Sequence, residues 1–314
     1  MKKISFVSGC YNEEENIEEL VNRVFKVCTK FPEFDFEYII IDNKSTDKSV
    51  DILTNITRLE PRLKVILNVR NFGHIRSPYY AMMQATGDAI IYLASDLQDP
   101  PEITEQFITK WKEGWKVVAA IKNKSEESIL FFMVRKLYYE LISKLSDLDL
   151  LKNFTGFGLY DKEVIENCRK MDDPYPYHRG MISELGYPVA KIPFTQPLRK
   201  RGFSKNNFYT LFDIAMLGFT NHTKIPLRLA SIFGFIFATL FSVIGLIYLS
   251  LKLLHWKEFS LGLAPITVGV FFAASVQLFF IGIVGEYIGA IYTKLNKRPL
   301  VIEEKRINFE IPPN

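Results

Sequence analysis

Blocks of apolar residues alternate with amphipathic segments along the first 120 residues of the chain. Five short apolar runs are typical of strands buried in a parallel sheet, and they occupy residues 4–8, 38–41, 64–67, 89–94 and 117–121. Apolar positions at helical spacing fill four intervening segments, at residues 16–30, 47–56, 77–85 and 101–113. This alternation predicts a doubly wound, Rossmann-like α/β domain, whose ligands bind at the carboxyl ends of the strands.

The second half of the chain carries two long stretches without charged residues. They cover residues 229–251 and 259–285, and each exceeds the roughly 20 apolar residues needed to cross a bilayer. A pair of buried core helices is the alternative, but soluble helices seldom lack charge over so many turns. Basic residues flank the pair at 224–228 and 294–298, which favours a cytoplasmic location for both ends. We therefore expect a multi-pass protein of the plasma (inner) membrane.

The remaining segments connect the strands to the membrane part. A helix is predicted at residues 128–145, followed by the glycine-punctuated "NFTGFGLYDKEVI" and the strand-like "YPVAKIPF". Residues 206–219 suit a helix that lies on the bilayer surface. The tail, "RPLVIEEKRINFE", could be a strand that returns to the soluble domain or pairs with another subunit. The predicted parts are a soluble domain (1–205), an interfacial helix (206–224), two transmembrane helices (225–293) and a cytoplasmic tail (294–314).

Charge and cysteine content restrict the function only a little further. The net charge of +4 is too small to indicate a nucleic-acid partner. Cys10, Cys28 and Cys168 lie far apart without zinc or redox spacing, as expected for reduced residues of a cytosolic domain. The N-terminal segment has too few apolar residues for a signal peptide.

Three polar segments follow the first, second and fourth apolar runs. They are "SGCYNEEEN", "DNKSTD" and "ASDLQDPPE", and they should converge at one edge of the sheet. Asp96 ends the fourth run, and its carboxylate is a suitable ligand for Mg²⁺ or Mn²⁺. Asp99 has a competing explanation as the cap of a helix whose first turn holds two prolines, with Glu102 closing a capping box.

These segments carry a family likeness. "YNEEENI" from Tyr11, "DNKSTD" from Asp42, "SDLQDPPE" from Ser95, "RKRGFSK" from Arg199 and the paired spans occur in this order. The chain thereby resembles the polyprenyl-phosphate glycosyltransferases of glycosyltransferase family 2, of the dolichyl-phosphate mannose synthase type with two C-terminal transmembrane helices. The resemblance implies a glycosyltransferase A-type (GT-A) domain that moves a sugar from a nucleotide sugar to a lipid phosphate.

The resemblance also implies roles for the polar residues at the sheet edge. The implied nucleotide-binding residues are Tyr11, Asn12, Glu13, Asp42, Asn43 and Arg70. The implied sugar or diphosphate contacts are Gln98, His74 and Arg76. Asp96 and Asp99 are the implied catalytic and metal-binding residues, although the family's second acid is replaced by Ala94. Structural alternatives remain, because residues 13–16 could simply begin a helix and Ser45 with Thr46 could cap one.

A basic cluster precedes the interfacial segment. Its implied lipid-phosphate ligands are Arg199, Arg201, Ser204 and Lys205, because arginine binds phosphate oxygens bidentately. Arg179 is a possible helper. The alternative is a polybasic strip attracted to anionic lipid. Glu286, near the end of the second span, is expected to pair within the membrane part rather than act in catalysis.

The chain departs from the family pattern in "TGFGLYD". Gly156 and Gly158 stand where related enzymes have an aspartate, proposed as the base, and an arginine. A phosphate acceptor has a second pKa of about 6 and is already ionised at neutral pH, so the loss of a base worth about 10²–10⁴-fold is tolerable. The glycines could instead make room for a bulkier sugar.

The expected function is transfer of a sugar from a nucleotide sugar, with UDP the expected carrier, to a polyprenyl phosphate. The acceptor would be undecaprenyl phosphate in a bacterium, the transfer would invert the anomeric centre, and the product would serve cell-envelope glycan or lipid modification. A catalytically inactive membrane scaffold, which Ala94 and Gly156 make conceivable, is one alternative. A processive polysaccharide synthase is the other, but none of Trp111, Trp115 and Trp256 lies in the Gln-x-x-Arg-Trp motif of those enzymes. The family also suggests a homo-oligomer.

Overall fold

A mixed eight-stranded sheet forms the centre of the soluble domain. The computed structural model describes residues 1–124, 151, 153–197, 216, 220, 223–254, 263–296 and 298–309. The strands are β1 (Lys3–Cys10), β2 (Asp35–Asp42), β3 (Leu63–Asn68), β4 (Ala89–Tyr92), β5 (Val117–Lys124), β6 (Phe154–Asp161), β7 (Val189–Thr195) and β8 (Glu303–Ile307). Their order across the sheet is β7-β5-β6-β4-β1-β2-β3-β8.

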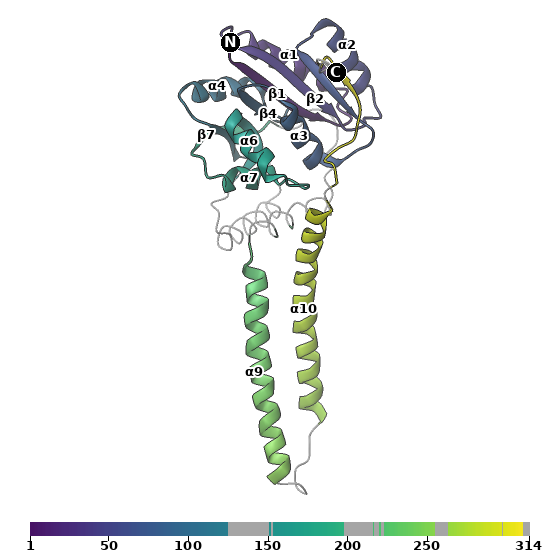
Figure 1. The fold of residues 1–314 in the computed structure, drawn as a ribbon, viewed down its shortest axis with the longest axis vertical. Helices are drawn as coiled ribbons and strands as arrows, with labels where there is room; N and C mark the ends of the chain where they lie inside the picture. Colours follow the sequence, from purple (N-terminus) through teal and green to yellow (C-terminus); the bar gives the residue numbers. More distant parts are fainter. Residues whose placement is uncertain are drawn as a thin grey trace.

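Helices cover both faces of this sheet (Figure 1). Those of the soluble domain are α1 (Ile17–Cys28), α2 (Ser49–Leu59), α3 (Gly73–Gln84), the 3₁₀ turn η1 (Pro101–Ile103), α4 (Thr104–Lys112), α6 (Lys162–Met171) and α7 (His178–Glu184). Alternate strand residues point to opposite faces: Phe6 packs in the cluster with α1, α2 and α4, whereas Val7 packs with α3, α6 and α7. Cys10, Cys28 and Cys168 are buried in these cores as free thiols.

The strand pairing confirms the sequence-based prediction on one half of the sheet and corrects it on the other. β1 pairs in parallel with β2 and β4, and β2 pairs in parallel with β3. β5 is a strand as predicted, but its neighbours are β7, in parallel, and β6, antiparallel. β6 separates β5 from β4, and this strand was not predicted because its two glycines indicated a connection.

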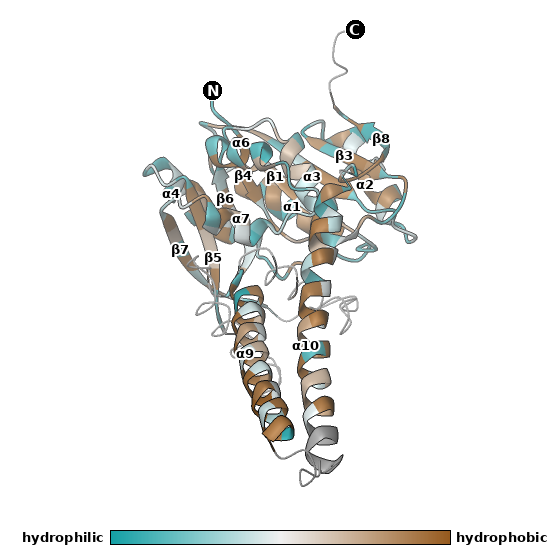
Figure 2. Ribbon diagram, turned by 60° about the horizontal axis from the view of Figure 1, so that its bottom comes forward, coloured by the Kyte–Doolittle hydropathy of each residue, from teal (hydrophilic) through white to brown (hydrophobic). Residues whose placement is uncertain are grey.

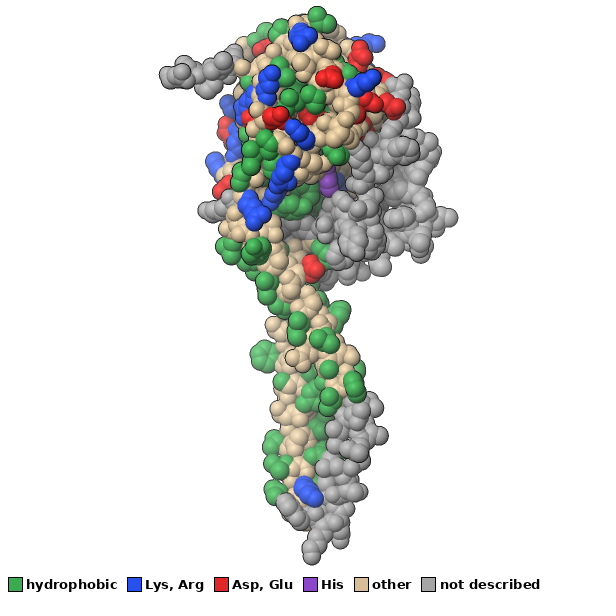
Figure 3. Space-filling model, turned by 90° about the vertical axis from the view of Figure 1, so that its right-hand side faces the viewer, with side chains coloured by type: hydrophobic (Ala, Val, Ile, Leu, Met, Phe, Trp, Pro, Cys, Tyr) green, Lys and Arg blue, Asp and Glu red, His purple; other side chains and the backbone are tan. Residues whose placement is uncertain are grey.

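Two long helices extend from the soluble domain. α9 (Ile225–Leu254) and α10 (Leu263–Leu295) contain the predicted spans, and both are long and apolar enough to cross a membrane. Apolar residues dominate their length (Figure 2), while charged side chains gather on the soluble domain (Figure 3). The Tyr287 hydroxyl of α10 donates to the Thr223 carbonyl just before α9, at 2.7 Å.

The C-terminal tail returns to the soluble domain. β8 pairs antiparallel with the edge strand β3, and Lys44 pairs with Glu304 at 2.6 Å. The Asn308 side-chain amide donates to the carbonyls of Thr57 and Leu63 at 2.8 and 3.0 Å. The tail is therefore a strand that returns to the soluble domain, which was the first of the two sequence-based alternatives. The start of α9 and the end of α10 both face the soluble domain (Figure 1). The predicted helix at 128–145 lies outside the described residues, as does nearly all of the interfacial segment.

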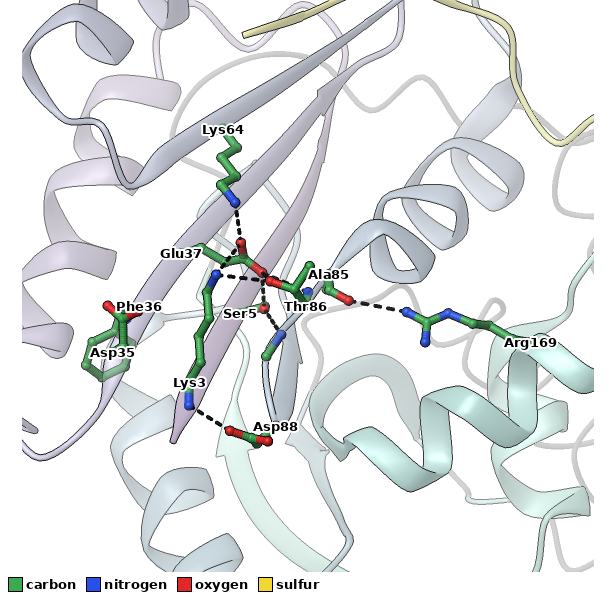
Figure 4. Close-up of polar contacts among 11 residues, drawn as sticks. Lys3, Ser5, Asp35, Phe36, Glu37, Lys64, Ala85, Thr86, Asp88 and Arg169 are labelled. Atoms are coloured by element: carbon green, nitrogen blue, oxygen red, sulfur yellow. Dashed lines mark hydrogen bonds and ion pairs between the residues drawn. The ribbon is translucent and has the colours of Figure 1, made fainter. Parts of the chain in front are cut away.

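A buried carboxylate joins three strands at the opposite end of the sheet from their carboxyl termini. Glu37 of β2 is 1% exposed and accepts hydrogen bonds from Ser5 (2.6 Å), the Thr86 backbone (2.8 Å) and Lys64 (2.7 Å), with Lys3 at 3.0 Å (Figure 4). Burial alone would raise its pKa, but the hydrogen bonds from Lys64, Ser5, Thr86 and Lys3 outweigh burial and lower the pKa to about 2.

Replacing Glu37 by glutamine is expected to destabilise the protein by about 3 kcal/mol at pH 7, because it leaves two lysines without their common partner. The folded pKa is about 2 against an ordinary 4.5, so the ionised group stabilises the fold above about pH 4.5 and this contribution is lost as the pH falls toward 2. Urea unfolding of the detergent-solubilised chain at pH 7 and pH 3 measures both effects, and the variant should show the smaller pH dependence.

Glu33→Gln, which removes an exposed pair with Lys112, is the control and should cost less than about 1 kcal/mol. Equal losses in the two variants would contradict this account.

Candidate active site

The polar segments after β1, β2 and β4 converge at one edge of the sheet, as predicted. The Asn12 backbone donates to the Ser45 hydroxyl at 2.8 Å, and the Asn12 side chain accepts from the Thr46 backbone at 2.7 Å. The Ser95 hydroxyl donates to the Gly9 carbonyl at 2.7 Å. These bonds hold the ends of β1, β2 and β4 against one another.

Each of these three segments contains a non-glycine residue in the left-handed region. Asn12, Lys44 and Leu97 have φ of 55°, 65° and 59°. Such conformations cost on the order of 1–3 kcal/mol each and cluster at functional sites. The described chain has three more such residues elsewhere, Asn153, Asp172 and Asn308, so these conformations agree with a functional edge but do not by themselves define one.

The turn after β1 leads into α1 and is held by hydrogen bonds of Glu13. The Glu13 backbone donates to the Ser49 hydroxyl at 2.9 Å, and the Glu13 carboxylate accepts from the Asn16 amide at 2.7 Å. Asn16 immediately precedes α1. The structural alternative for residues 13–16 is therefore realised in these contacts, and a nucleotide role for Tyr11, Asn12 and Glu13 stays a prediction.

Asp42 lies at the bottom of the same edge. It is 1% exposed and accepts hydrogen bonds from the backbone and hydroxyl of Ser45. Burial raises the pKa of Asp42, and the Ser45 bonds oppose that rise. The prediction that Ser45 caps the next helix was wrong: α2 begins at Ser49, whose backbone donates to Asp47 at 3.0 Å. Ser45 instead donates hydrogen bonds to the Asp42 carboxylate and fixes its position.

Asn43 fastens the loop between β3 and α3. Its amide nitrogen donates to Asn71 and to the Gly73 carbonyl, at 2.9 and 3.1 Å. Its oxygen accepts from the Asn68 amide and the Phe72 backbone, at 3.2 and 2.8 Å. This loop carries Arg70, whose guanidinium stacks 4.0 Å from the Phe72 ring. The contacts of Asn43 make it a positioning residue for the loop, and its predicted contact with base or ribose stays a prediction.

Asp96 and Asp99 share the tight loop after β4. Asp96 is partly exposed, and its carboxylate accepts from the Gln98 backbone at 3.1 Å. Asp99 is 4% exposed and accepts from the Ala94 backbone at 3.0 Å. Burial raises the pKa of Asp99 to about 6, the Ala94 bond opposes the rise, and the charge of Asp96 adds to it.

The predicted capping role of Asp99 was wrong. The 3₁₀ turn η1 follows Pro100 with no side-chain cap, because the Asp99 carboxylate turns back toward the end of β4. Glu102 does not close a capping box either; it pairs with Arg23 of α1 at 2.7 Å. Asp99 is therefore free of the structural task that competed with a role in the site.

Two carboxylates in one loop are a ligand set suited to a divalent cation whose other ligands come from a substrate and water. Mg²⁺ is commonly held by one or two carboxylates together with substrate phosphates and water. Within the residues that the structure describes, no three acidic, histidine or cysteine side chains gather as a complete metal site. Asp96 and Asp99 stay the predicted ligands of a divalent cation, and Asp96 is the more accessible of the two.

His74 and Arg76 lie at two different cavities. His74 lines a cavity of about 170 Å³ with Tyr92, Gly156 and Arg179. Arg76 lines another of about 500 Å³ with Tyr175 and with residues of α10. The structure therefore places His74 beside the edge of β4 and Arg76 beside the membrane part, although the sequence analysis gave both the same role.

The two glycines of β6 have different structural causes. Gly156 has φ of 99°, which disfavours any other residue, and a Cβ there would lie 3.7 Å from the Tyr92 ring. A Cβ at Gly158 would lie 2.4 Å from the Val118 carbonyl of β5. No side chain, and thus no family arginine, fits at Gly158. Asp161 caps α6 and accepts from Trp111 at 2.8 Å, so it has structural partners.

Some residues of this edge were not singled out from the sequence. Tyr92, Thr155 and His178 line the smaller cavity, and the charge of Lys122 acts on Asp99. The available signals were the polar tip of β4 and the "YHRG" segment, in which only Arg179 was considered. The predicted lipid-phosphate ligands Arg199, Arg201, Ser204 and Lys205 lie outside the described part of the chain.

The sheet order, the carboxylate loop after β4 and the antiparallel β6 define a glycosyltransferase of the GT-A type. The comparison with protein families then identifies the glycosyltransferase family. The model described as "Glycosyl transferase family 2" matches residues 5–169, and the chain belongs to this family. The family and fold predicted from the motifs are confirmed.

Several curated glycosyltransferases are similar to the chain over nearly its whole length. The uncharacterized glycosyltransferase YkcC of Bacillus subtilis is 32% identical, over 98% of this chain and 94% of that protein. The bactoprenol glucosyl transferase of Shigella phage SfX is 29% identical, over 97% and 99%. Among solved structures, the mannosyltransferase PcManGT from Pyrobaculum calidifontis, in complex with GDP-Man and Mn²⁺, aligns over 94% of this chain and 87% of that one, with 16% identity and a TM-score of 0.46.

Proposed function

We propose that the protein transfers a hexose from a UDP-sugar to a polyprenyl phosphate at the cytoplasmic face of the membrane, with inversion of the anomeric centre. The full-length similarity to a bactoprenol glucosyl transferase supports the polyprenyl acceptor and makes glucose the first sugar to test. In a bacterium the acceptor is undecaprenyl phosphate. The product then serves as a lipid-linked sugar donor for the cell envelope.

One observation carries this proposal: a cavity lies between α3 of the soluble domain and α10 of the membrane part. The cavity of about 500 Å³ is lined by Arg76 of α3 and Tyr175, and on its other side by Gly285, Glu286 and Gly289 of α10. α3 begins at the carboxyl end of β3, the edge that also carries Asp96. A lipid headgroup held at the end of α10 therefore lies near the ends of the strands, where a nucleotide sugar binds in such sheets.

The residues of the edge divide the chemistry between them. Asp96 and Asp99 hold Mg²⁺ or Mn²⁺, which when bound stabilises negative charge on the leaving diphosphate. Tyr11, Asn12, Glu13, Asp42 and Arg70 bind the nucleotide, and Asn43 holds the Arg70 loop in place. The bond from the anomeric carbon to the diphosphate breaks as a lipid phosphate oxygen forms the new one. Because the acceptor phosphate is already ionised, a glycine at position 156 is compatible with turnover.

The basic segment before the membrane part completes the site in this proposal. Arg199, Arg201, Ser204 and Lys205 bind the lipid phosphate, with Gln98 directed to the sugar or diphosphate. The basic flanks of the helix pair support a cytoplasmic active site and cytoplasmic termini. A homo-oligomer is part of the proposal and rests on the family resemblance.

Incubation of the purified chain with labelled UDP-glucose, Mg²⁺ and undecaprenyl phosphate tests this function. Label in the organic extract is the expected result. Undecaprenol, which lacks the phosphate, should give less than about a hundredth of that product, because an alcohol needs a base worth about 10²–10⁴-fold. A labelled water-soluble polymer would indicate a processive synthase instead. Nucleotide binding without any product, across a panel of nucleotide sugars, would indicate an inactive scaffold.

A further inference from the structure

A small cavity opens beside the carboxylate loop, on the α3 and α7 side of the sheet. It measures about 170 Å³, which corresponds to about five or six water molecules at roughly 30 Å³ each. Much of its lining is apolar or aromatic: Ile75, Pro78, Tyr79, Met82, Tyr92 and Pro176. An apolar cavity with a few placed polar groups is typical of a small-molecule site.

Two side chains of this lining carry buried polar atoms without a partner in the described protein. They are the Thr155 hydroxyl and both ring nitrogens of His178. A buried polar group left unsatisfied costs about 1–3 kcal/mol, so atoms that find no partner among the described residues are candidates to bind a ligand. The His178 ring is fixed edge-on to Tyr160 at 4.8 Å and lies 6.1 Å from Tyr79. The ring therefore packs between two aromatic side chains that give its nitrogens no hydrogen-bond partner.

The two groups are neutral. Burial lowers the pKa of His178 to about 3, and the charge of Arg179 acts in the same direction. At neutral pH the ring therefore offers one donor and one acceptor, as the Thr155 hydroxyl also can. This combination matches the hydroxyl groups of a sugar, and the guanidinium of Arg179, which lines the same cavity, can donate to sugar oxygens as well.

The cavity adjoins the reaction centre. Tyr92, one of its walls, ends β4 and lies within electrostatic reach of Asp99 and Asp96. Gly156, which has no side chain, faces the Tyr92 ring. A group bound here therefore lies next to the carboxylates that bind the diphosphate in the proposed function.

We propose that this cavity receives the neutral hexose of the donor, and that Thr155 and His178 select it by hydrogen bonds to its hydroxyl groups. The proposal rests on the proposed function for the presence of a nucleotide sugar. It adds the place where the hexose binds and two specificity-determining residues for its free hydroxyl groups. Ordered water is the other possible occupant, and the test separates the two.

Calorimetric binding of UDP-glucose and of UDP to the full-length chain, with Mg²⁺ and without acceptor lipid, tests the cavity. Thr155→Val and His178→Phe should each weaken UDP-glucose binding about tenfold, the loss expected for one hydrogen bond, and leave UDP binding unchanged. Thr155→Ser, which keeps the hydroxyl, is the matched control and should bind both like the unmodified chain. Unchanged binding of both ligands, or equal weakening of both, would overturn the proposal.

Monodeoxy analogues of UDP-glucose give a second readout that fold damage cannot imitate. Removal of a sugar hydroxyl that Thr155 or His178 binds should weaken binding to the unmodified chain about tenfold. It should not weaken binding further to the variant that lacks the partner of that hydroxyl. Additive losses with every analogue would overturn the assignment. Because no lipid is present, a failure of lipid transfer leaves this test intact. The same comparison with GDP and GDP-glucose distinguishes a wrong nucleotide from a wrong sugar site.

Discussion

Replacing Asp96 by asparagine is expected to lower the rate of sugar transfer by about 10³-fold or more. The change keeps the shape and the acceptor oxygen for the Gln98 backbone but removes the charge available to a cation on the leaving diphosphate. Loss of one group that stabilises developing charge typically costs about 10²–10³-fold, and weaker cation binding adds to that loss. Initial rates of lipid-linked product formation, over a range of Mg²⁺ and Mn²⁺ concentrations, measure the effect.

Glu102→Gln is the matched control for this experiment. Glu102 lies six residues further along the chain, in η1, and pairs with Arg23 on the surface, so its loss should change the rate by less than about twofold. Thermal unfolding should be unchanged by Asp96→Asn, since the side chain is partly exposed. More than a tenth of the normal rate in the Asp96 variant would remove this residue from the chemistry.

Replacing Gly158 by alanine is expected to destabilise the soluble domain by about 3 kcal/mol or more. The new Cβ would lie 2.4 Å from the Val118 carbonyl oxygen, and Gly158 pairs with Ala119 inside the sheet. The two nearest backbone atoms, of Val118 and Ala119, both belong to β5. The conflict therefore cannot be relieved by a side-chain rotation, and overpacking costs about 1–3 kcal/mol even where side chains can move. Chemical unfolding of the full chain measures the loss.

Gly114→Ala separates this steric effect from backbone strain. Gly114 has φ of 100° and open space around it, so alanine there should cost about 1 kcal/mol. If Gly158→Ala were no worse than this control, the sheet would have room for a side chain at position 158. The family arginine would then be absent for a reason other than space.

The sequence was sufficient to predict the strands that are continuous apolar runs and the helices whose apolar residues recur at helical spacing. Apolar runs such as residues 38–41 are buried in the sheet on both sides and carry a strong signal. β6 was missed because Gly156 and Gly158 resemble a turn, whereas one takes a left-handed conformation and the other avoids contact with β5. Local composition cannot reveal a close approach between strands that are distant in sequence.

The candidate site was predicted in part for the same reason. The convergence of Asn12, Ser45 and Ser95 follows from the topology of a parallel sheet, which the alternation of elements predicts. The actual tasks of Asn43 and Asp99 depend on hydrogen bonds to loops and strand ends that no periodicity encodes. Thr155 and His178 were missed because they meet only where β6 and α7 are folded together.

The order of the chain has a consequence for biogenesis. The eighth strand of the sheet is encoded after both long helices, so a ribosome delivers it only when the hydrophobic hairpin has already emerged. Until then the edge of β3 remains open to other partners. The catalytic half can therefore gather most of its core early during synthesis, yet its last strand is added only after the hairpin has had the opportunity to enter the bilayer.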